Sequence, residues 1–122
     1  MEKQVKFLNN ISENDLAVLY HLASLSIYIS FFEGFGLPVI ESMASGCPVI
    51  TSNVSCLPET AGGAAILCSP NNFNELGIQI KTLLENNNLQ NDLIQKGIER
   101  ARLFHPEFFA EKMISLYNGI LS

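Results

Sequence analysis

The residues best suited to chemistry lie between positions 30 and 48, where two carboxylates and two glycines fall close together. Glu33 and Glu41 have seven residues between them, and Gly34 and Gly36 follow the first carboxylate. An ionised carboxylate is a good acceptor for the paired hydroxyl donors of a ribose or hexose. Glycine permits a positive φ and the close approach of a ligand. The pattern predicts a site for a hydroxyl-rich ligand.

The surrounding residues predict a strand, a glycine loop and a helix that position these side chains. An apolar run predicts a strand over 25–30, and Pro38 suits the first position of a helix over 38–45. This start places Glu41 in the first turn, where the helix dipole favours a negative charge. The free amides between Phe35 and Val39, Pro38 excepted, are predicted to receive an anion such as a phosphate. A nucleotide-sugar needs this combination of hydroxyl-binding carboxylates and a phosphate cradle.

The rest of the chain predicts an open parallel sheet with helices on both faces. Apolar runs at 5–8, 48–52 and 65–68 complete a sheet of about four strands. Ser12 and Asp15 approximate a capping box, which predicts a core-facing helix after them. Ligands of such sheets bind beyond the carboxyl ends of the strands, where Glu33 is expected.

Three apolar stripes predict helices after Pro70. The asparagines at 86–88 separate the first two stripes, and His105 and Pro106 separate the last two. The stripes are Leu76, Ile80, Leu83 and Leu84; Leu93, Gly97, Ala101 and Phe104; and Phe109, Met113, Leu116, Tyr117 and Ile120.

Composition narrows the function class. The 122 residues are expected to form one folded domain, and the net charge of −5 argues against a nucleic-acid partner. No apolar run approaches the roughly 18 residues of a membrane span, and no signal peptide is recognised, so the cytoplasm is the expected location. Three cysteines without close pairing predict neither a disulfide framework nor a metal site.

The stretch from Glu33 to Ile50 closely resembles the Glu-x7-Glu signature of the group 1 (family 4) retaining glycosyltransferases. The Leu-Pro-Glu and glycine segment at 52–62 strengthens the resemblance, as do 5–8 and 97–101. The match covers nearly the whole chain but only about the last third of a family enzyme. It implies a Rossmann-like half of a GT-B fold, with residues 1–122 forming a single partial C-terminal donor-binding domain.

The resemblance also implies a role for each matching residue. Glu33 would contact the transferred sugar near the reacting centre, and Glu41 would accept the ribose hydroxyls. The implied donor is a nucleotide-sugar, no metal or cofactor is expected, and polysaccharide or glycoconjugate biosynthesis is the implied setting. The implied donor-binding residues are Ser30, Gly34, Phe35, Gly36, Leu37 and Glu41.

The chain departs from the family in its cations. No Lys or Arg occurs between Lys6 and Lys81, whereas the family supplies an Arg and a Lys from earlier in this domain and an acceptor pocket from an N-terminal domain. A diphosphate leaving group needs such charge. We therefore expect a chain that is inactive alone and needs the missing acceptor domain or a partner chain. Peripheral contact with the inner membrane would come through that missing domain, and self-association is expected through the N-terminal strand or last helix.

Other interpretations remain open at this level. The glycines alone are typical of an ordinary turn, and Glu41 alone is typical of a dipole contact. Phe31, Phe32 and Phe35 are expected to form a lid or core rather than a stacking platform for a base. A noncatalytic binding or assembly module of the same fold is the main alternative to a transferase, and a nucleotide-sugar epimerase fragment is the next.

Overall fold

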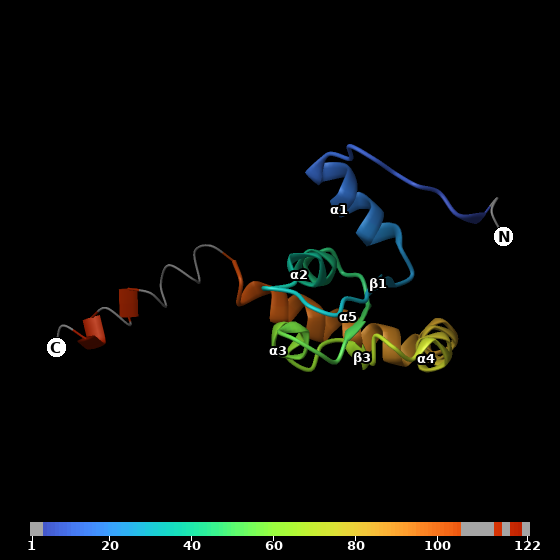
Figure 1. Cartoon of the computed structure of the whole chain (residues 1–122). Coiled ribbons are helices and arrows are strands. Elements are labelled where there is room, and N and C mark those ends of the chain that lie inside the picture. Colours follow the sequence, from blue (N-terminus) through green and yellow to red (C-terminus); the bar gives the residue numbers. More distant parts are fainter. Residues whose placement is uncertain (1–3, 106–113, 116–117, 121–122) are drawn as a thin grey trace.

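Three short parallel strands form the centre of the molecule in a computed structural model that describes residues 4–105, 114–115 and 118–120. They are β1 (Ser26–Tyr28), β2 (Val49–Ser52) and β3 (Ile66–Cys68), and they follow one another across the sheet in that order. β2 pairs with both neighbours, so β1 and β3, which Figure 1 labels, are the two outer strands. The predicted strands at 25–30, 48–52 and 65–68 are confirmed with shorter bounds, as is the α/β class.

The predicted strand at 5–8 is wrong. The segment has no strand structure, and the side chain of Phe7 is 91% exposed. An extended segment becomes a strand only when its backbone groups bond to a neighbouring strand. Among the described residues none pairs with this segment, so this part of the chain holds three strands rather than about four.

Helices connect and cover the strands. Side-chain oxygens of Ser12, Asn72 and Asn86 accept hydrogen bonds from amides three residues on, at 3.0 to 3.1 Å, and so fix three of the helix starts. The break predicted at 86–88 is confirmed at Asn86 alone, which caps one helix while ending another, because Asn87 and Asn88 are already helical. The helices are α1 (Glu13–Leu22), α2 (Leu37–Ala44), α3 (Leu57–Ala61), α4 (Phe73–Glu85) and α5 (Asn87–Arg102).

The core lies on both faces of the sheet, as predicted. Val49 and Ile50 are fully buried and, as neighbours in β2, point to opposite faces. Val49 belongs to a cluster with residues of α2 and α3, whereas Ile50 belongs to a cluster with Leu83 of α4. α5 contributes to both clusters, through Ala101 to the first and Leu93 to the second.

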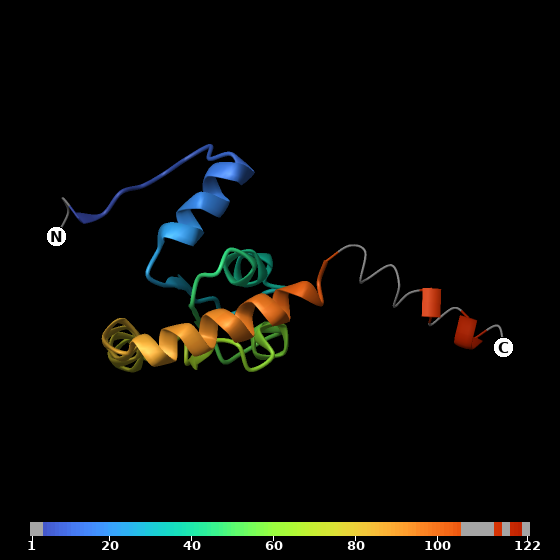
Figure 2. The ribbon, with the colours of Figure 1, turned by 180° about the vertical axis from the view of Figure 1, so that it is seen from behind.

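α5 lies against α2 at a glycine. A Cβ on Gly97 would come within 3.2 Å of the Met43 side chain, which is tighter than most real contacts, and would also touch the Met43 Cα at 3.6 Å. The missing side chain therefore lets the two helices approach closely. Figure 2 shows α5 running across the molecule beside α2, with α4 at one end.

α1 lies on the opposite side of α2 from α3 (Figures 1 and 2). The helix predicted here exists, but the prediction that it faces the core is wrong, because no residue of α1 is buried. Leu16 and Tyr20 are half-buried against α2, whereas Val18 and Leu22 are 55% and 75% exposed. α1 thus has one covered side and one uncovered apolar side.

The last predicted stripe is only partly covered by the structure. Phe109, Met113, Leu116 and Tyr117 lie outside the described residues, and Ile120 is helical and exposed. Within the described segments, no helix combines the length and apolar character needed to cross a membrane.

Candidate functional site

The loop that carries Glu33 leaves the carboxyl end of β1, where the sequence places it. The Ser30 amide donates to Ser52 Oγ at 2.8 Å, and Thr51 Oγ1 donates to the Tyr28 carbonyl at 2.7 Å. Ser30 Oγ donates to the Phe32 carbonyl at 3.0 Å, which tightens the loop locally. The predicted donor-binding residue Ser30 therefore joins the loop to β2.

Glu33 is held through both its main chain and its side chain. Ser55 Oγ accepts from the Glu33 amide at 3.2 Å and donates to the Glu33 carbonyl at 2.9 Å. Cys56 Sγ donates to the same carbonyl at 3.0 Å. The Tyr28 hydroxyl donates to Glu33 Oε1. Half-buried Glu33 is thus held by Tyr28, Ser55 and Cys56.

The contact between Tyr28 and Glu33 changes the pKa of the Tyr28 phenol. The hydrogen bond to Glu33, with smaller contributions from burial and from the Glu33 charge, raises the pKa of Tyr28 to about 12. Ionisation of Tyr28 would break this hydrogen bond and place a phenolate next to the Glu33 carboxylate, so the neutral phenol is favoured.

The two glycines of the loop differ. Gly36 is buried with a φ of +87°, and a Cβ there would come within 2.7 Å of the Leu57 side chain, so the fold itself needs this glycine. Gly34 is exposed, lies outside the positive-φ set, and a Cβ there would meet no atom within 4 Å. Gly34 therefore leaves open space at the protein surface beside Glu33.

Phe35 is anchored from α3 and from the end of α5. Thr60 Oγ1 donates to the Phe35 carbonyl at 2.5 Å, and the rings of Phe35 and Phe104 pack edge to face with centroids 5.4 Å apart. Arg100 lies over the Phe104 ring at 5.1 Å. A hollow of about 200 Å³ forms here, lined by Gly34, Phe35, Cys56, Glu59, Thr60 and Phe104.

The start of α2 corrects the predicted anion cradle. α2 begins at Leu37, so Pro38 is its second residue rather than its first. The Val39 amide donates to the Gly36 carbonyl at 3.0 Å and is not available to a ligand. The predicted cradle is therefore limited to the amides of Phe35, Gly36 and Leu37. Leu37 is 59% exposed at this helix start.

Glu41 lies one residue further into its helix than predicted. Because α2 starts at Leu37, Glu41 falls in the second turn, and the first turn contains no acidic residue. The expected dipole contact is weaker there, since that effect fades beyond the first turn. Its exposed side chain instead faces the groove between α1 and α2.

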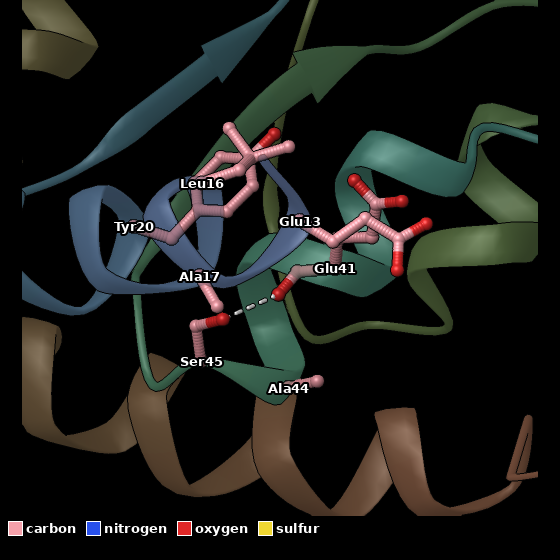
Figure 3. Close-up of a pocket in the computed structure, with 7 residues that line it drawn as sticks. All are labelled: Glu13, Leu16, Ala17, Tyr20, Glu41, Ala44 and Ser45. Carbon is pink, nitrogen blue, oxygen red and sulfur yellow. Dashed lines mark hydrogen bonds between the residues drawn. The ribbon is translucent and has the colours of Figure 1, made fainter. Parts of the chain in front are cut away.

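This groove of about 330 Å³ combines acidic, aromatic and apolar lining. Figure 3 shows the carboxylates of Glu13 and Glu41 at one end and Leu16 and Tyr20 at the other. Ser45 Oγ donates to the Glu41 carbonyl at 2.9 Å (Figure 3). Burial, followed by the Glu41 charge, raises the pKa of Tyr20, so its hydroxyl stays protonated. The groove offers hydroxyl acceptors next to an apolar wall.

Phe31 and Phe32 do not form core. Their side chains are 66% and 81% exposed, because the loop carries them away from both clusters. The core interpretation of these two residues is wrong, and a lid role stays a prediction.

The three cysteines are free thiols, with Cys47 and Cys68 buried. Across the residues that the structure describes, no three His, Cys, Asp or Glu side chains gather as metal ligands would.

Sequence reasoning missed most of the residues that hold the loop. Tyr28 looks like any aromatic residue in a buried strand, and Thr60 like any small residue in a loop. Arg100 reaches Glu59 and Thr60 from 41 and 40 residues away, so no local pattern shows it. Pro58 gave the one usable signal, since it lies in the first turn of the short helix α3, which supplies Thr60.

Comparison with known proteins places this arrangement in a family. Residues 1–100 match the model for glycosyl transferases group 1. The O-antigen chain mannosyltransferase B of Escherichia coli is 34% identical over 116 residues, which cover 95% of this chain and 30% of that protein. The MMP alpha-(1->4)-mannosyltransferase of Mycolicibacterium hassiacum is 32% identical, over 93% of this chain and 29% of that protein.

Solved structures agree with these sequence matches. Sucrose-phosphate synthase from Thermosynechococcus elongatus superimposes with a TM-score of 0.82 and 34% identity, over 98% of this chain and 31% of that chain. The C-terminal domain of a group 1 family glycosyl transferase from Francisella tularensis superimposes with a TM-score of 0.67 and 25% identity, over 80% of this chain and 50% of that chain. The predicted GT-B type of α/β fold is therefore confirmed. This chain spans less than a third of the curated relatives named here, and it belongs to the group 1 glycosyl transferase family.

Proposed function

We propose that this chain binds the nucleotide-sugar donor of a retaining glycosyltransferase. Family membership supports transfer chemistry, and the loop from Glu33 to Leu37 supports the site. The observation that carries the proposal is that neither the backbone conformation nor the packing at position 34 requires a glycine there. A ligand that approaches the backbone closely beside a fixed carboxylate explains that glycine.

Each part of the site has a proposed role. Glu33 contacts the transferred sugar near its reacting carbon, and the amides from Gly34 to Leu37 lie along the sugar and diphosphate. Glu41 accepts the ribose hydroxyls from its groove between α1 and α2. Metal ions and cofactors have no part in the proposal, in which the nucleotide-sugar is a substrate.

The names of the relatives suggest which donor to test first. Two of the proteins compared above are named mannosyltransferases, one of them for an O-antigen chain. A nucleotide-activated hexose, with mannose first, is therefore the proposed donor class. Synthesis of a polysaccharide or glycoconjugate in the cytoplasm stays a prediction.

A partner is part of the proposal. Arg100 is already bonded to the carbonyls of Glu59 and Thr60, so it is committed to α3 rather than to a diphosphate. We propose that a second domain or chain supplies both the acceptor pocket and the cations, and that this chain is inactive alone. The exposed apolar residues Phe7 and Leu8 suit a contact with such a partner or with a second copy. We use the term complemented transferase for this chain together with an acceptor-binding domain.

Donor titration followed by amide NMR tests the proposal. Without the partner's cations we expect a nucleoside diphosphate or its mannose ester to bind with a Kd of about 1 mM or weaker. This Kd corresponds to a binding free energy of about 4 kcal/mol or less in magnitude. Shift changes are expected at Gly34–Leu37 and at Glu41. Changes confined to other surfaces, or a micromolar Kd for the isolated chain, would contradict the assignment.

A further inference from the structure

The hydroxyl of Tyr28 reaches from the sheet to the loop. Tyr28 pairs with Thr51 across β1 and β2, its carbonyl accepts from Thr51 Oγ1 at 2.7 Å, and its ring packs partly against the core cluster of α2 and α3. Strand pairing, hydrogen bonding and packing therefore all fix this residue. Its hydroxyl is the one part directed at Glu33, where it donates to Oε1.

We propose that Tyr28 is a positioning residue that holds the Glu33 carboxylate in the orientation used for sugar transfer. This inference rests on the proposed function, because it assigns Glu33 to the transferred sugar. Tyr28 itself touches no reacting atom in this scheme.

The contacts around Glu33 show what Tyr28 adds. Ser55 and Cys56 fix its main chain through the amide and carbonyl, but they leave its side-chain torsions free to rotate. Tyr28 removes that freedom by holding Oε1. In the described part of the chain no donor bonds to Oε2, which leaves this oxygen for a ligand hydroxyl. A carboxylate held by a packed neighbour loses less entropy when the ligand arrives.

The pairing has a signature that simple packing lacks. The pKa of Tyr28 lies near 12 because its phenol donates to a carboxylate. Replacing Glu33 with Gln keeps a hydrogen-bond acceptor but removes the negative charge. The Tyr28 pKa should then fall back toward the ordinary value of about 10.

The first experiment follows the Tyr28 phenol in the 122-residue chain by 13Cζ NMR as the pH rises. Tyr28→Phe assigns the signal among the three tyrosines by removing it. We expect a titration well above pH 10 in the wild type and a lower one in Glu33→Gln. A wild-type phenol that titrates near 10, or one that Glu33→Gln leaves unchanged, would overturn the pairing.

The second experiment measures sugar transfer by the complemented transferase with the nucleotide-sugar donor. Tyr28→Phe keeps the ring, so we expect kcat to fall about tenfold while the donor KM changes by less than about threefold. Thr82→Val is the matched control, because it deletes a hydroxyl that donates only to the Ile78 carbonyl on the exposed side of α4, and it should keep wild-type kinetics.

The two experiments separate the two hypotheses. A wild-type kcat in Tyr28→Phe would overturn the positioning role even where the proposed function holds. A complemented wild type that transfers no sugar would contradict the proposed function, and with it the catalytic part of the inference. The phenol titration would still decide whether Tyr28 holds Glu33.

Discussion

Arg100 closes the carboxyl end of α3 by donating from Nε to the Thr60 carbonyl at 3.1 Å. Its Nη2 donates to the Glu59 carbonyl at 2.6 Å, so two carbonyls left over at the helix end gain a charged donor. Thr60 in turn donates its hydroxyl to the Phe35 carbonyl. A chain of contacts therefore joins α5 to the glycine loop through one residue of α3.

Removal of the Arg100 guanidinium should loosen this connection. Arg100→Met keeps much of the aliphatic stem but leaves the Glu59 and Thr60 carbonyls without their donor. We expect the free energy of unfolding to fall by about 1 to 3 kcal/mol, measured by urea denaturation. Arg102→Met is the control, since Arg102 is exposed on the same helix and should stay within about 0.5 kcal/mol of the wild type. Equal effects of the two changes would show that the contacts of Arg100 with α3 contribute nothing to the free energy of unfolding.

The two loop glycines should respond in opposite ways to alanine. Gly36→Ala combines a positive φ with a contact to Leu57, so we expect a loss of about 1 to 3 kcal/mol of stability. Gly34→Ala meets no protein atom, so stability should stay within about 0.5 kcal/mol while donor binding weakens at least about tenfold. Thermal unfolding and donor titration separate the two effects. Gly34→Ala with normal donor affinity would remove the main support for the site.

Glu41 should matter for the nucleoside part of the donor. Glu41→Gln keeps the size of the side chain but loses a charged acceptor in the groove between α1 and α2. We expect affinity for a nucleoside diphosphate to fall about tenfold, the effect of losing one charge-assisted hydrogen bond. The matched change Glu85→Gln, on the exposed end of α4, should have no effect. Binding is measured by amide NMR, and equal affinities in the two variants would contradict the ribose contact.

Local features were predictable from the sequence, and contacts between distant residues were not. Ser12 caps its helix as expected, because a cap depends on residues only a few positions apart. The segment at 5–8 failed as a strand because a strand needs a neighbour that the pattern cannot supply. Glu41 moved from the first to the second turn because α2 starts one residue earlier than Pro38 indicated.

In the candidate site, too, the residues close together in the sequence were predictable, and the distant residues that contact them were not. Glu33, Gly34, Phe35 and Gly36 stand in a run that the sequence displays directly. The residues that hold them, Tyr28, Ser55, Thr60 and Arg100, come from a strand, a loop and two helices that only folding brings together.

Sugar transfer by the complemented transferase shows whether Glu33 acts in a retaining transfer reaction. The product's anomeric configuration and the transfer rate are measured together by NMR, for the wild type and for Glu33→Gln. We expect retained configuration in the wild type, a rate at least about a hundredfold lower in Glu33→Gln, and no transfer by this chain alone. A wild-type rate in Glu33→Gln, or transfer by the isolated chain, would contradict this expectation.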